Sequence, residues 1–462
     1  MARGLLRWLD ERLDVTALWR AFLDRPVPGG IGWFHVFGSA TLFLLAVQIA
    51  TGIFLTVYYS PSADHAYQSI RFISQEVPFG QFVRGIHRWS ASFLVVIIGL
   101  HMLRVFLYGA YKYPREATWV TGVVLLLVVL GFAFTGYLLP FDEQAYWATV
   151  VGTNIAGAAP FVGEWALRLL RGGTAIGELT LQRFYAFHVW LLPATLLLFV
   201  AAHLFMVIRQ GIAAPPRRRP LDLGPAAAAL PRRERYEREY AMEKRAGHPF
   251  YLSVLKDAVT ALVLFLAIGV LAVAVGGPVG APADPNATSY VPRPEWYFLD
   301  FFQLLWYLKG QWEPFWIFLA VTGVVLMLLL LPFYDRNPQR HPARRPFATF
   351  CAGLAVVGIL GLTYLGIRAP APAGQAGPPP AAPAAGAAAA GARQFQVQGC
   401  VNCHTVAGVG GSLGPDLTHV GARLSRAQIE TTVTHGKGAM PAFATLTRQD
   451  LDALLDYLQA LK

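Results

Sequence analysis

Two apolar stretches, each with two histidines, decide the fold of this chain. They read GIHRWSASFLVVIIGLHMLRVFL (residues 85–107) and FYAFHVWLLPATLLLFVAAHLFMVIR (residues 184–209). Each is long enough to cross about 30 Å of hydrocarbon as a helix. A histidine inside such a span is costly to bury and indicates function. Four histidines in two spans, namely His87, His101, His188 and His203, therefore indicate a shared binding task.

The spacing of these histidines predicts what they bind. His87 and His101 are 14 residues apart, and His188 and His203 are 15 apart. On a helix these intervals correspond to about 21 and about 22 Å of rise, so both histidines of a span share one face. In antiparallel helices His87 then meets His188, and His101 meets His203. Such pairs predict two haems b, each held by two imidazoles.

Glycines and arginines support the same interpretation. Gly38 and Gly52 are 14 residues apart, as are Gly122 and Gly136. A flat group between helices needs a close backbone, which glycine provides. Glycine is common in membrane helices, but its repeat at the histidine interval favours contact with haem. Arg84 and Arg88 flank His87 and are candidates to pair with haem propionates. The alternative is that they extend to the membrane interface.

Composition excludes several other classes of protein. Of the 462 residues, 55% are apolar and 14% are charged, whereas soluble domains have about 25% charged residues. An ordinary soluble enzyme and a disordered chain are excluded, and three cysteines are too few for a disulfide scaffold. The net charge of +11, from 38 basic and 27 acidic residues, fits basic loops at a membrane surface. No nucleic-acid partner is expected.

The pattern predicts an all-α membrane protein with a small all-α soluble domain at its C-terminus. A four-helix dihaem bundle is joined by three further transmembrane helices. The seven expected spans are 32–57, 85–107, 118–138, 184–209, 254–275, 314–333 and 347–366. The expected regions are an amphipathic cytoplasmic segment (1–31), the dihaem bundle (32–215), the three-helix part (250–366), an Ala/Pro linker (369–393) and the soluble domain (394–462).

The distribution of Lys and Arg predicts the orientation in a bacterial-type inner (plasma) membrane. Basic residues concentrate in 1–31, 108–117, 210–253 and 334–346, whereas loops 58–83 and 277–312 have few. Because basic loops stay in the cytoplasm, the N-terminus is expected there. Seven crossings then place the C-terminal domain on the outer, periplasmic side.

The C-terminal domain carries a haem-attachment motif. Cys400-Val401-Asn402-Cys403-His404 has the C-x-x-C-H pattern, in which two cysteines bind a haem c covalently and the histidine ligates its iron. A thiol redox pair or a zinc site is the alternative. Met440, within Gly438-Ala439-Met440-Pro441, is the expected second iron ligand, with His419 and His435 as rivals.

Longer motifs resemble one known family. These are His87-Arg88-Trp89-Ser90, Gly136-Tyr137-Leu138-Leu139-Pro140 and Pro294-Glu295-Trp296-Tyr297. Together with the histidine pairs, they resemble cytochrome b of the quinol–cytochrome c oxidoreductases, the cytochrome bc complexes, over about residues 30–366. Residues 30–215 are similar to its haem-bearing half, and residues 250–366 to the partner that photosynthetic relatives make separately. Residues 394–462 resemble a class I cytochrome c.

One position departs from the photosynthetic members of that family. They have a cysteine in the first helix that tethers an extra haem, and Val36 stands at that position here. No cysteine precedes Cys351. We therefore expect no additional tethered haem.

The resemblance implies an enzyme subunit that oxidises quinol at the outer face and sends its two electrons to different acceptors. One electron goes to an iron–sulfur centre and then to cytochrome c, and the other passes through the two haems b to a quinone at the inner face. Protons are translocated in this cycle. The same resemblance implies Glu295 as proton acceptor and Tyr297 as its hydrogen-bonding partner. Tyr137, Pro140 and Trp147 are expected to wall the same pocket. The inner quinone site is expected near His203, with Arg209 as a candidate.

The resemblance also implies partners, namely an electron acceptor such as a cytochrome c, and a second copy of the chain. A Rieske centre needs two Cys and two His. Cys351 is the one cysteine outside the C-x-x-C-H motif, so the Rieske iron–sulfur protein must be a separate chain.

Two other functions fit the histidine pairs. One is a dihaem membrane anchor of another respiratory dehydrogenase or hydrogenase, and the other is a non-catalytic electron conduit. The Glu295 motif discriminates against both, because neither needs a proton acceptor in an outer loop.

Overall fold

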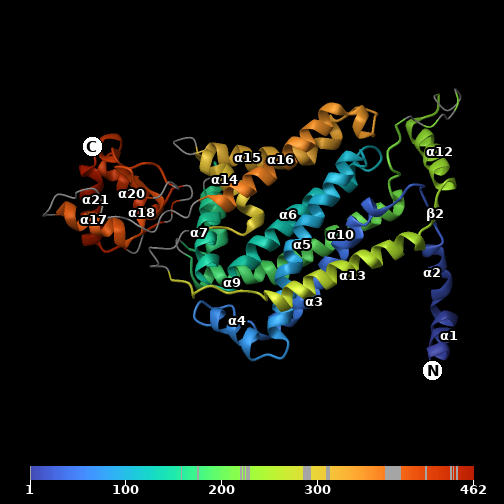
Figure 1. The fold of residues 1–462 in the computed structure, drawn as a ribbon, viewed down its shortest axis with the longest axis horizontal. Coiled ribbons are helices and arrows are strands. Elements are labelled where there is room, and N and C mark those ends of the chain that lie inside the picture. The colour runs from blue at the N-terminus through green and yellow to red at the C-terminus, as the bar shows by residue number, and fades with distance from the viewer. Residues whose placement is uncertain are drawn as a thin grey trace.

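The chain forms a bundle of long helices with a separate helical region at its C-terminal end (Figure 1). The computed structural model describes residues 2–462 except 158, 174–175, 219–220, 222–223, 225–228, 285–292, 309–312, 370–386, 411–413, 438–439, 441 and 444–445. In this part of the chain, seven helical segments are long and apolar enough to cross a membrane. The predicted fold class, an all-α multi-pass membrane protein, is confirmed.

The membrane helices lie close to the expected spans. They are α3 (Phe37–Tyr58), α5 (Gly80–Leu107), α6 (Glu116–Leu138), α9 to α10 (Glu178–Gln210), α13 (Tyr251–Ala274), α15 (Glu313–Tyr334) and α16 (Pro346–Arg368). Their shared core lies between α3, α5, α6, α10 and α13, with Leu44, Leu94, Val129, Leu196 and Ile268 buried. Large apolar side chains on α13, α15 and α16 remain exposed, as expected for surfaces that face lipid.

The fourth span is not a uniform α-helix. It consists of α9 (Glu178–Ala186), one wide turn of π type, η2 (Phe187–Leu191), and α10 (Leu192–Gln210). Pro193 at the start of α10 has no N–H to continue the regular ladder. A wide turn accommodates this loss, and His188 lies in it.

Short helices position the loops at the end of the bundle that carries His87 and His188. We term this the outer end and the opposite one the inner end, after the orientation that the basic loops predict. The short helices are α4 (Ala66–Gln75), α7 (Glu143–Gly157), α8 (Gly163–Arg171), η3 (Trp296–Phe298) and α14 (Leu299–Tyr307). Asp142 precedes α7, and its carboxylate accepts hydrogen bonds from the backbone N–H of Ala145 (2.9 Å) and of Gly280 (2.9 Å). The same side chain therefore begins α7 and fixes the loop after α13.

The inner end differs in detail from the expectation. Residues 1–31 contain two helices, α1 (Ala2–Leu13) and α2 (Val15–Leu23), because Asp14 has a left-handed backbone (φ 50°) that interrupts the helix. Pro26–Val27 (β1) pairs with His248–Pro249 (β2). The short helices η1 (Trp33–His35) and η4 (Pro342–Arg344) and the charged helix α12 (Arg232–Arg245) lie in the connections.

A buried ionic cluster joins the two halves of the membrane region. The carboxylate of Asp335, after α15, forms ion pairs with Lys112 Nζ at 3.0 Å and with Arg345 Nη2 at 3.1 Å. It also accepts a hydrogen bond from the Tyr111 hydroxyl. Tyr111, Lys112 and Arg345 are all at least nine-tenths buried. Because removing one partner leaves buried charge uncompensated, the cluster fixes the loop 108–115 against the loop 335–345.

The C-terminal region has a core of its own. Its helices are α17 (Ala387–Val397), α18 (Cys400–Cys403), α19 (Val420–Arg423), α20 (Arg426–His435) and α21 (Arg448–Ala460), with the small ladder β3 (Thr405–Val406) and β4 (Val409–Gly410). Phe395, Leu454 and Leu455 are fully buried in it. The expected linker 369–393 falls largely outside the described residues, and α17 begins before its expected end.

Candidate functional site

The outer histidine pair lies between α5 and the fourth span. The ring centroids of His87 and His188 are 6.4 Å apart, with their planes at 69°. A metal–imidazole nitrogen bond is about 2 Å, so two such bonds and two half-rings account for roughly this separation. The pair can therefore face one metal ion from opposite sides, as a bis-imidazole haem requires.

The inner pair comes from the same two elements, about four helical turns further on. His101 lies on α5 and His203 on α10, close enough to interact electrostatically. The structure thus brings together the histidines that the spacing predicts to be partners, one pair near each end of the bundle.

Each of the four glycines faces one histidine ring. A Cβ built on Gly136 would lie 2.5 Å from Cε1 of His188, and one on Gly38 would lie 3.2 Å from Cε1 of His101. The corresponding distances are 3.4 Å from Gly52 to His87 and 3.5 Å from Gly122 to His203. A side chain at Gly136 therefore has no room, whereas at Gly122 it would make ordinary contact.

Three histidines are oriented by a threonine that precedes the glycine. Thr51 Oγ1 lies 2.8 Å from His87 Nδ1, Thr135 Oγ1 lies 3.1 Å from His188 Nδ1, and Thr121 Oγ1 lies 3.0 Å from His203 Nδ1. Each hydroxyl donates its own proton to the carbonyl four residues earlier. The threonine must then accept from Nδ1–H, which leaves the lone pair of Nε2 free to ligate a metal.

His101 is the exception among the four. Residue 37 is Phe, so no threonine precedes Gly38. The Nδ1 atom of His101 instead lies 3.3 Å from Nη2 of Arg104, one turn later on α5. Ser39, which follows Gly38, donates to the carboxylate of Asp257 at 2.7 Å. Because a guanidinium only donates, this contact does not hold His101 in the tautomer that the threonines impose on the other three histidines. The glycine spacing of all four positions, and the threonine contacts of three, fit haem b.

The predicted proton acceptor lies next to the outer pair. The side chain of Glu295 is 13% exposed, and its carboxylate pairs with Nη2 of Arg88 at 3.1 Å. Arg88 directly follows His87, so this ion pair ties the loop before α14 to the histidine helix. Arg84 instead donates to Ser74 at 2.9 Å. Both arginines predicted to serve propionates therefore have protein partners in this structure.

Tyr297 is a neutral hydrogen-bond donor in the same loop. Burial raises the pKa of its hydroxyl well above the ordinary value, and the negative charge of Glu295 raises it further. Tyr137 and Gln144 both donate to the backbone carbonyl of Arg293, at 3.5 and 3.4 Å. The end of α6 and the start of α7 therefore hold the segment that leads to Glu295. Trp147 packs in the neighbouring core around Leu138 and Tyr146.

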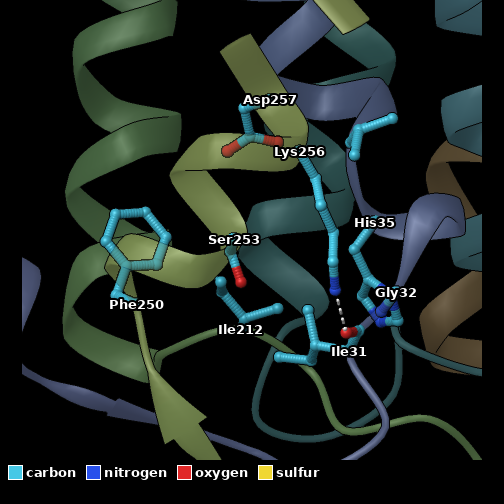
Figure 2. A pocket seen from close by; sticks show the side chains of 9 residues that line it. Ile31, Gly32, His35, Ile212, Phe250, Ser253, Lys256 and Asp257 are labelled. Carbon is cyan, nitrogen blue, oxygen red and sulfur yellow. Dashed lines mark hydrogen bonds between the residues drawn. The ribbon is translucent and has the colours of Figure 1, made fainter. Parts of the chain in front are cut away.

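A cavity at the inner end contains polar groups that the sequence analysis missed (Figure 2). Lys256 Nζ reaches from α13 to the carbonyl of Ile31 at 3.2 Å. In the described part of the chain, His35 Nε2 and Ser253 Oγ are buried without a hydrogen-bond partner. Burial lowers the pKa of His35 to about 4, and the charge of Arg104 adds to this effect. The lining residues are Ile31, Gly32, His35, Val36, Ile212, Phe250, Ser253, Lys256 and Asp257.

Arg209, the candidate named with His203 for the inner quinone site, does not line this cavity, and that prediction stays untested. A usable signal was present in the sequence. Lys256 and Asp257 are adjacent charged residues inside an otherwise apolar span, and such residues indicate a functional site.

The C-terminal region presents the motif residues around a glycine-lined space. His404 is 7% exposed, and its Nδ1 lies 2.9 Å from the carbonyl of Pro415. A Cβ on Gly414 would collide with the His404 ring. Met440 packs against the same core as Cys400. His419 and His435 are exposed, and His435 is engaged by Thr431 and Thr434 of its own helix. Cys400, Cys403 and His404 supply the donor types that a haem c needs, and Met440 stays a prediction as the second ligand.

Seven apolar helices with histidine pairs at both ends of one bundle define a class of membrane proteins suited to hold metal macrocycles. Family models agree. Residues 22–211 match cytochrome b/b6/petB, residues 282–376 match cytochrome b(C-terminal)/b6/petD, and residues 386–458 match cytochrome c oxidase, cbb3-type, subunit III.

Individual relatives give the same result. The cytochrome b subunit of menaquinol:cytochrome c reductase from Geobacillus thermodenitrificans is 48% identical over 223 residues, which is 46% of this chain and all of the relative. Its counterpart from Bacillus subtilis (strain 168) is 46% identical over the same length, with the same coverage of both chains. Cytochrome b6 of Picosynechococcus is 41% identical over 211 residues, 46% of this chain and 95% of the relative.

A solved structure is similar over most of the chain. The hyperthermophilic respiratory Complex III superposes with a TM-score of 0.67 at 30% identity, covering 79% of this chain and 92% of that one. The chain belongs to the cytochrome b/b6 family, and it contains sequences that match both halves of cytochrome b.

Proposed function

We propose that the chain is the quinol-oxidising, haem-bearing subunit of a quinol:cytochrome c reductase. His87 and His188 would hold the outer haem b, and His101 and His203 the inner one. The observation that carries this proposal is the seating of all four histidine rings on glycines. Three of the rings are also held by threonine in the tautomer that frees Nε2.

We further propose that Cys400, Cys403, His404 and Met440 hold a covalent haem c in residues 394–462. When bound, the haems b supply a one-electron path between the two membrane faces, and the haem c supplies a separate one-electron acceptor. Bifurcated oxidation of quinol, a two-electron donor, requires two separate one-electron acceptors of this kind. With Val36 in place of a cysteine, the proposed complement is two haems b and one haem c.

The quinol site is proposed at the outer loop around Glu295. Its carboxylate is mostly buried and has one charged partner, Arg88, so it can accept a proton from a hydroxyl bound beside it. Tyr297 remains protonated and can donate a hydrogen bond to the bound ring. Tyr137, Pro140 and Trp147 are proposed to wall the pocket. Protons accepted here leave at the outer face.

The quinone-reducing site is proposed at the inner cavity. Its orphaned polar atoms, His35 Nε2 and Ser253 Oγ, can each donate a hydrogen bond to a quinone oxygen. Lys256 and Asp257 can supply the protons that reduction of quinone takes up. Protons taken up here and released outside charge the membrane.

Orientation and partners follow from the same proposal. We propose that the N-terminus lies in the cytoplasm and the C-terminal domain outside, because basic loops are retained on the cytoplasmic side. The proposed iron–sulfur partner is a separate Rieske protein, because Cys351 alone cannot supply two thiolates. A soluble or membrane-bound cytochrome c is the proposed acceptor, and the assembly is proposed to be a homodimer. The proposed functional regions are the amphipathic segment (1–31), the dihaem bundle (32–215), the three-helix part (250–366), the linker (369–393) and the haem c domain (394–462).

The alternative is a dihaem anchor or passive conduit. Neither role explains why a buried glutamate from a loop about 200 residues away pairs with the arginine beside His87. The ion pair between Arg88 and Glu295 therefore favours quinol oxidation.

The test is Glu295→Gln, which keeps the shape of the side chain and removes its basicity. Quinol oxidation should fall by about 100-fold or more, the range of a positioned general base, while all haem absorption bands persist. Glu164→Gln on the outer helix α8, where the glutamate is exposed, is the matched control and should retain turnover. Unchanged turnover in Glu295→Gln would refute the role of Glu295. A haem assay should return two haems b and one haem c, and a second haem c would contradict the role given to Val36.

A further inference from the structure

A contact between the membrane region and the C-terminal region stands apart from the sites described above. The side-chain amide of Asn154, on α7, donates to the backbone carbonyl of Met440 at 2.8 Å. The two residues are 286 positions apart in the chain. The C-terminal helices lie beside α7 at the outer end of the bundle (Figure 1).

The amide of Asn154 is oriented for this contact by buried neighbours. Arg171, which is 3% exposed, donates from Nη2 to Asn154 Oδ1 at 2.7 Å and to the carbonyl of Val150 at 3.0 Å. Its Nε donates to Thr153 Oγ1 at 2.8 Å. Because Arg171 occupies the oxygen of the Asn154 amide, the NH₂ group is directed away from α7 and toward the C-terminal region.

Met440 is held on the opposite side of the contact in a defined way. Its N–H donates to the carbonyl of Lys437 at 3.0 Å, and its side chain packs against the core that includes Cys400. The thioether therefore points into the C-terminal region, and the carbonyl of the same residue points out to Asn154. The segment that carries Met440, the proposed iron ligand, therefore makes the contact with Asn154 itself.

The helix α7 also connects this contact to the quinol loop. Gln144 near its first turn holds the carbonyl of Arg293, two residues before Glu295. Gln144 and Asn154 are ten residues apart, about 15 Å along a helix. One rigid element therefore touches the quinol loop at one end and the proposed haem c ligand segment at the other.

We propose that the C-terminal end of α7, centred on Asn154 and supported by Arg171, is the docking surface for the haem c domain of the same chain. Docking presents the Met440 side of that domain to the outer end of the membrane region. The proposal rests on the proposed function, because it takes Met440 as an iron ligand. We expect the bound position to be transient, since the contact described between Asn154 and Met440 is a neutral hydrogen bond, which contributes a modest factor. The tether keeps the local concentration of the domain high.

The test uses Asn154→Asp and Asn154→Ala in the full-length, haem-loaded complex. Aspartate retains an oxygen for Arg171 but opposes the Met440 carbonyl with a second acceptor, whereas alanine removes both contacts. Asn337→Asp, at an exposed position on the inner side, is the matched control.

The first measurement detects docking directly and needs no turnover. Cys351, an exposed thiol, is replaced by serine, and Ala156→Cys and Lys437→Cys are introduced for a short bismaleimide cross-link. The cross-link should form in this background. Its yield should fall about fivefold when Asn154→Asp is added, the factor expected for one neutral hydrogen bond. An unchanged yield would overturn the proposal.

The second measurement follows haem reduction after quinol is added. Both Asn154 variants should slow haem c reduction about fivefold and leave haem b reduction unchanged, and Asn337→Asp should change neither. If alanine slows haem c reduction and aspartate does not, the effect arises from Arg171 and the docking proposal fails. If quinol does not reduce haem c in the unaltered chain, the proposed function fails, while the cross-link still decides the docking contact.

Discussion

The two ends of the histidine bundle are built differently. At the outer end, both His87 and His188 are held at Nδ1 by a threonine, and the neighbouring Glu295 has an ion-pair partner. At the inner end, His203 is held in the same way, but His101 is not. The cavity beside Gly38 leaves His35 Nε2 and Ser253 Oγ without partners in the described structure.

This difference indicates that the two ends have different roles. A fully satisfied polar network is rigid, whereas unsatisfied buried groups favour a bound molecule that can complete them. At the outer end Trp147 Nε1 is the buried side-chain atom without a partner among the described residues near the quinol loop, and the histidines and Glu295 there are held by protein groups. At the inner end His35 Nε2 and Ser253 Oγ remain available to a bound polar molecule, as the proposed quinone site requires.

The largest expected effect comes from adding one methyl group at each end. Gly136→Ala places Cβ 2.5 Å from the His188 ring, whereas Gly122→Ala places it 3.5 Å from the His203 ring. Gly136→Ala should lose most of the outer haem b, and Gly122→Ala should retain the inner one. A redox titration at the haem b bands separates the two haems. Equal loss of haem b in both variants would contradict the predicted difference between the outer and inner ends.

A smaller effect is expected at the inner cavity. Asp257→Asn keeps an acceptor for Ser39 but cannot exchange a proton, so reoxidation of the inner haem b by quinone should slow by roughly tenfold. Quinol oxidation at the outer end should begin at its normal rate. Asp64→Asn, an exposed position in an outer loop, is the control. A normal rate of reoxidation in Asp257→Asn would exclude this cavity as the proton-donating site.

The threonine contacts predict a change in potential. Accepting a hydrogen bond from Nδ1–H makes the imidazole a more basic ligand, which stabilises oxidised iron. Thr51→Val should therefore raise the potential of the outer haem b by a few tens of millivolts, since about 59 mV corresponds to a tenfold change for one electron. Thr56→Val is the control, because the Thr56 hydroxyl donates to the Ile53 carbonyl of its own helix. A lowered potential, or a shift of the inner haem alone, would contradict this assignment.

The smallest expected effect is on stability against acid. The pKa of His35 is lowered from 6.5 to about 4 in the folded chain. The unfolded chain therefore binds a proton that the folded chain does not between these values, and stability falls as pH decreases from 6.5 toward 4. His35→Gln should flatten this part of the profile of thermal unfolding in detergent. An unaltered slope would show that His35 is not responsible.

The sequence predicted the parts of the fold that depend on local pattern. Apolar length gave the seven spans, and helical spacing gave the histidine partners and the glycines that face them. These features need only a regular helix and two antiparallel neighbours. The threonines at 51, 121 and 135 were also readable, because each directly precedes one of those glycines, but their hydroxyl geometry is visible only in the folded chain.

The remaining features depend on contacts between distant segments. The pairing of Arg88 with Glu295 and of Asn154 with Met440 joins positions about 200 and 286 residues apart, and no local periodicity encodes such contacts. The wide turn at His188 and the break at Asp14 depend on single backbone positions. The helices α7 and α12 were not predicted, because they lie in segments whose polarity resembles that of loops.

The ionic cluster around Asp335 has a consequence for how this protein can be assembled. Its members come from either side of the long segment between α10 and α13, and their ion pairs are made directly with one another. Tyr236 of that segment packs against Tyr113 and Arg340 of the same two loops. We therefore expect that the two portions, produced as separate polypeptides, would still associate through these buried charges.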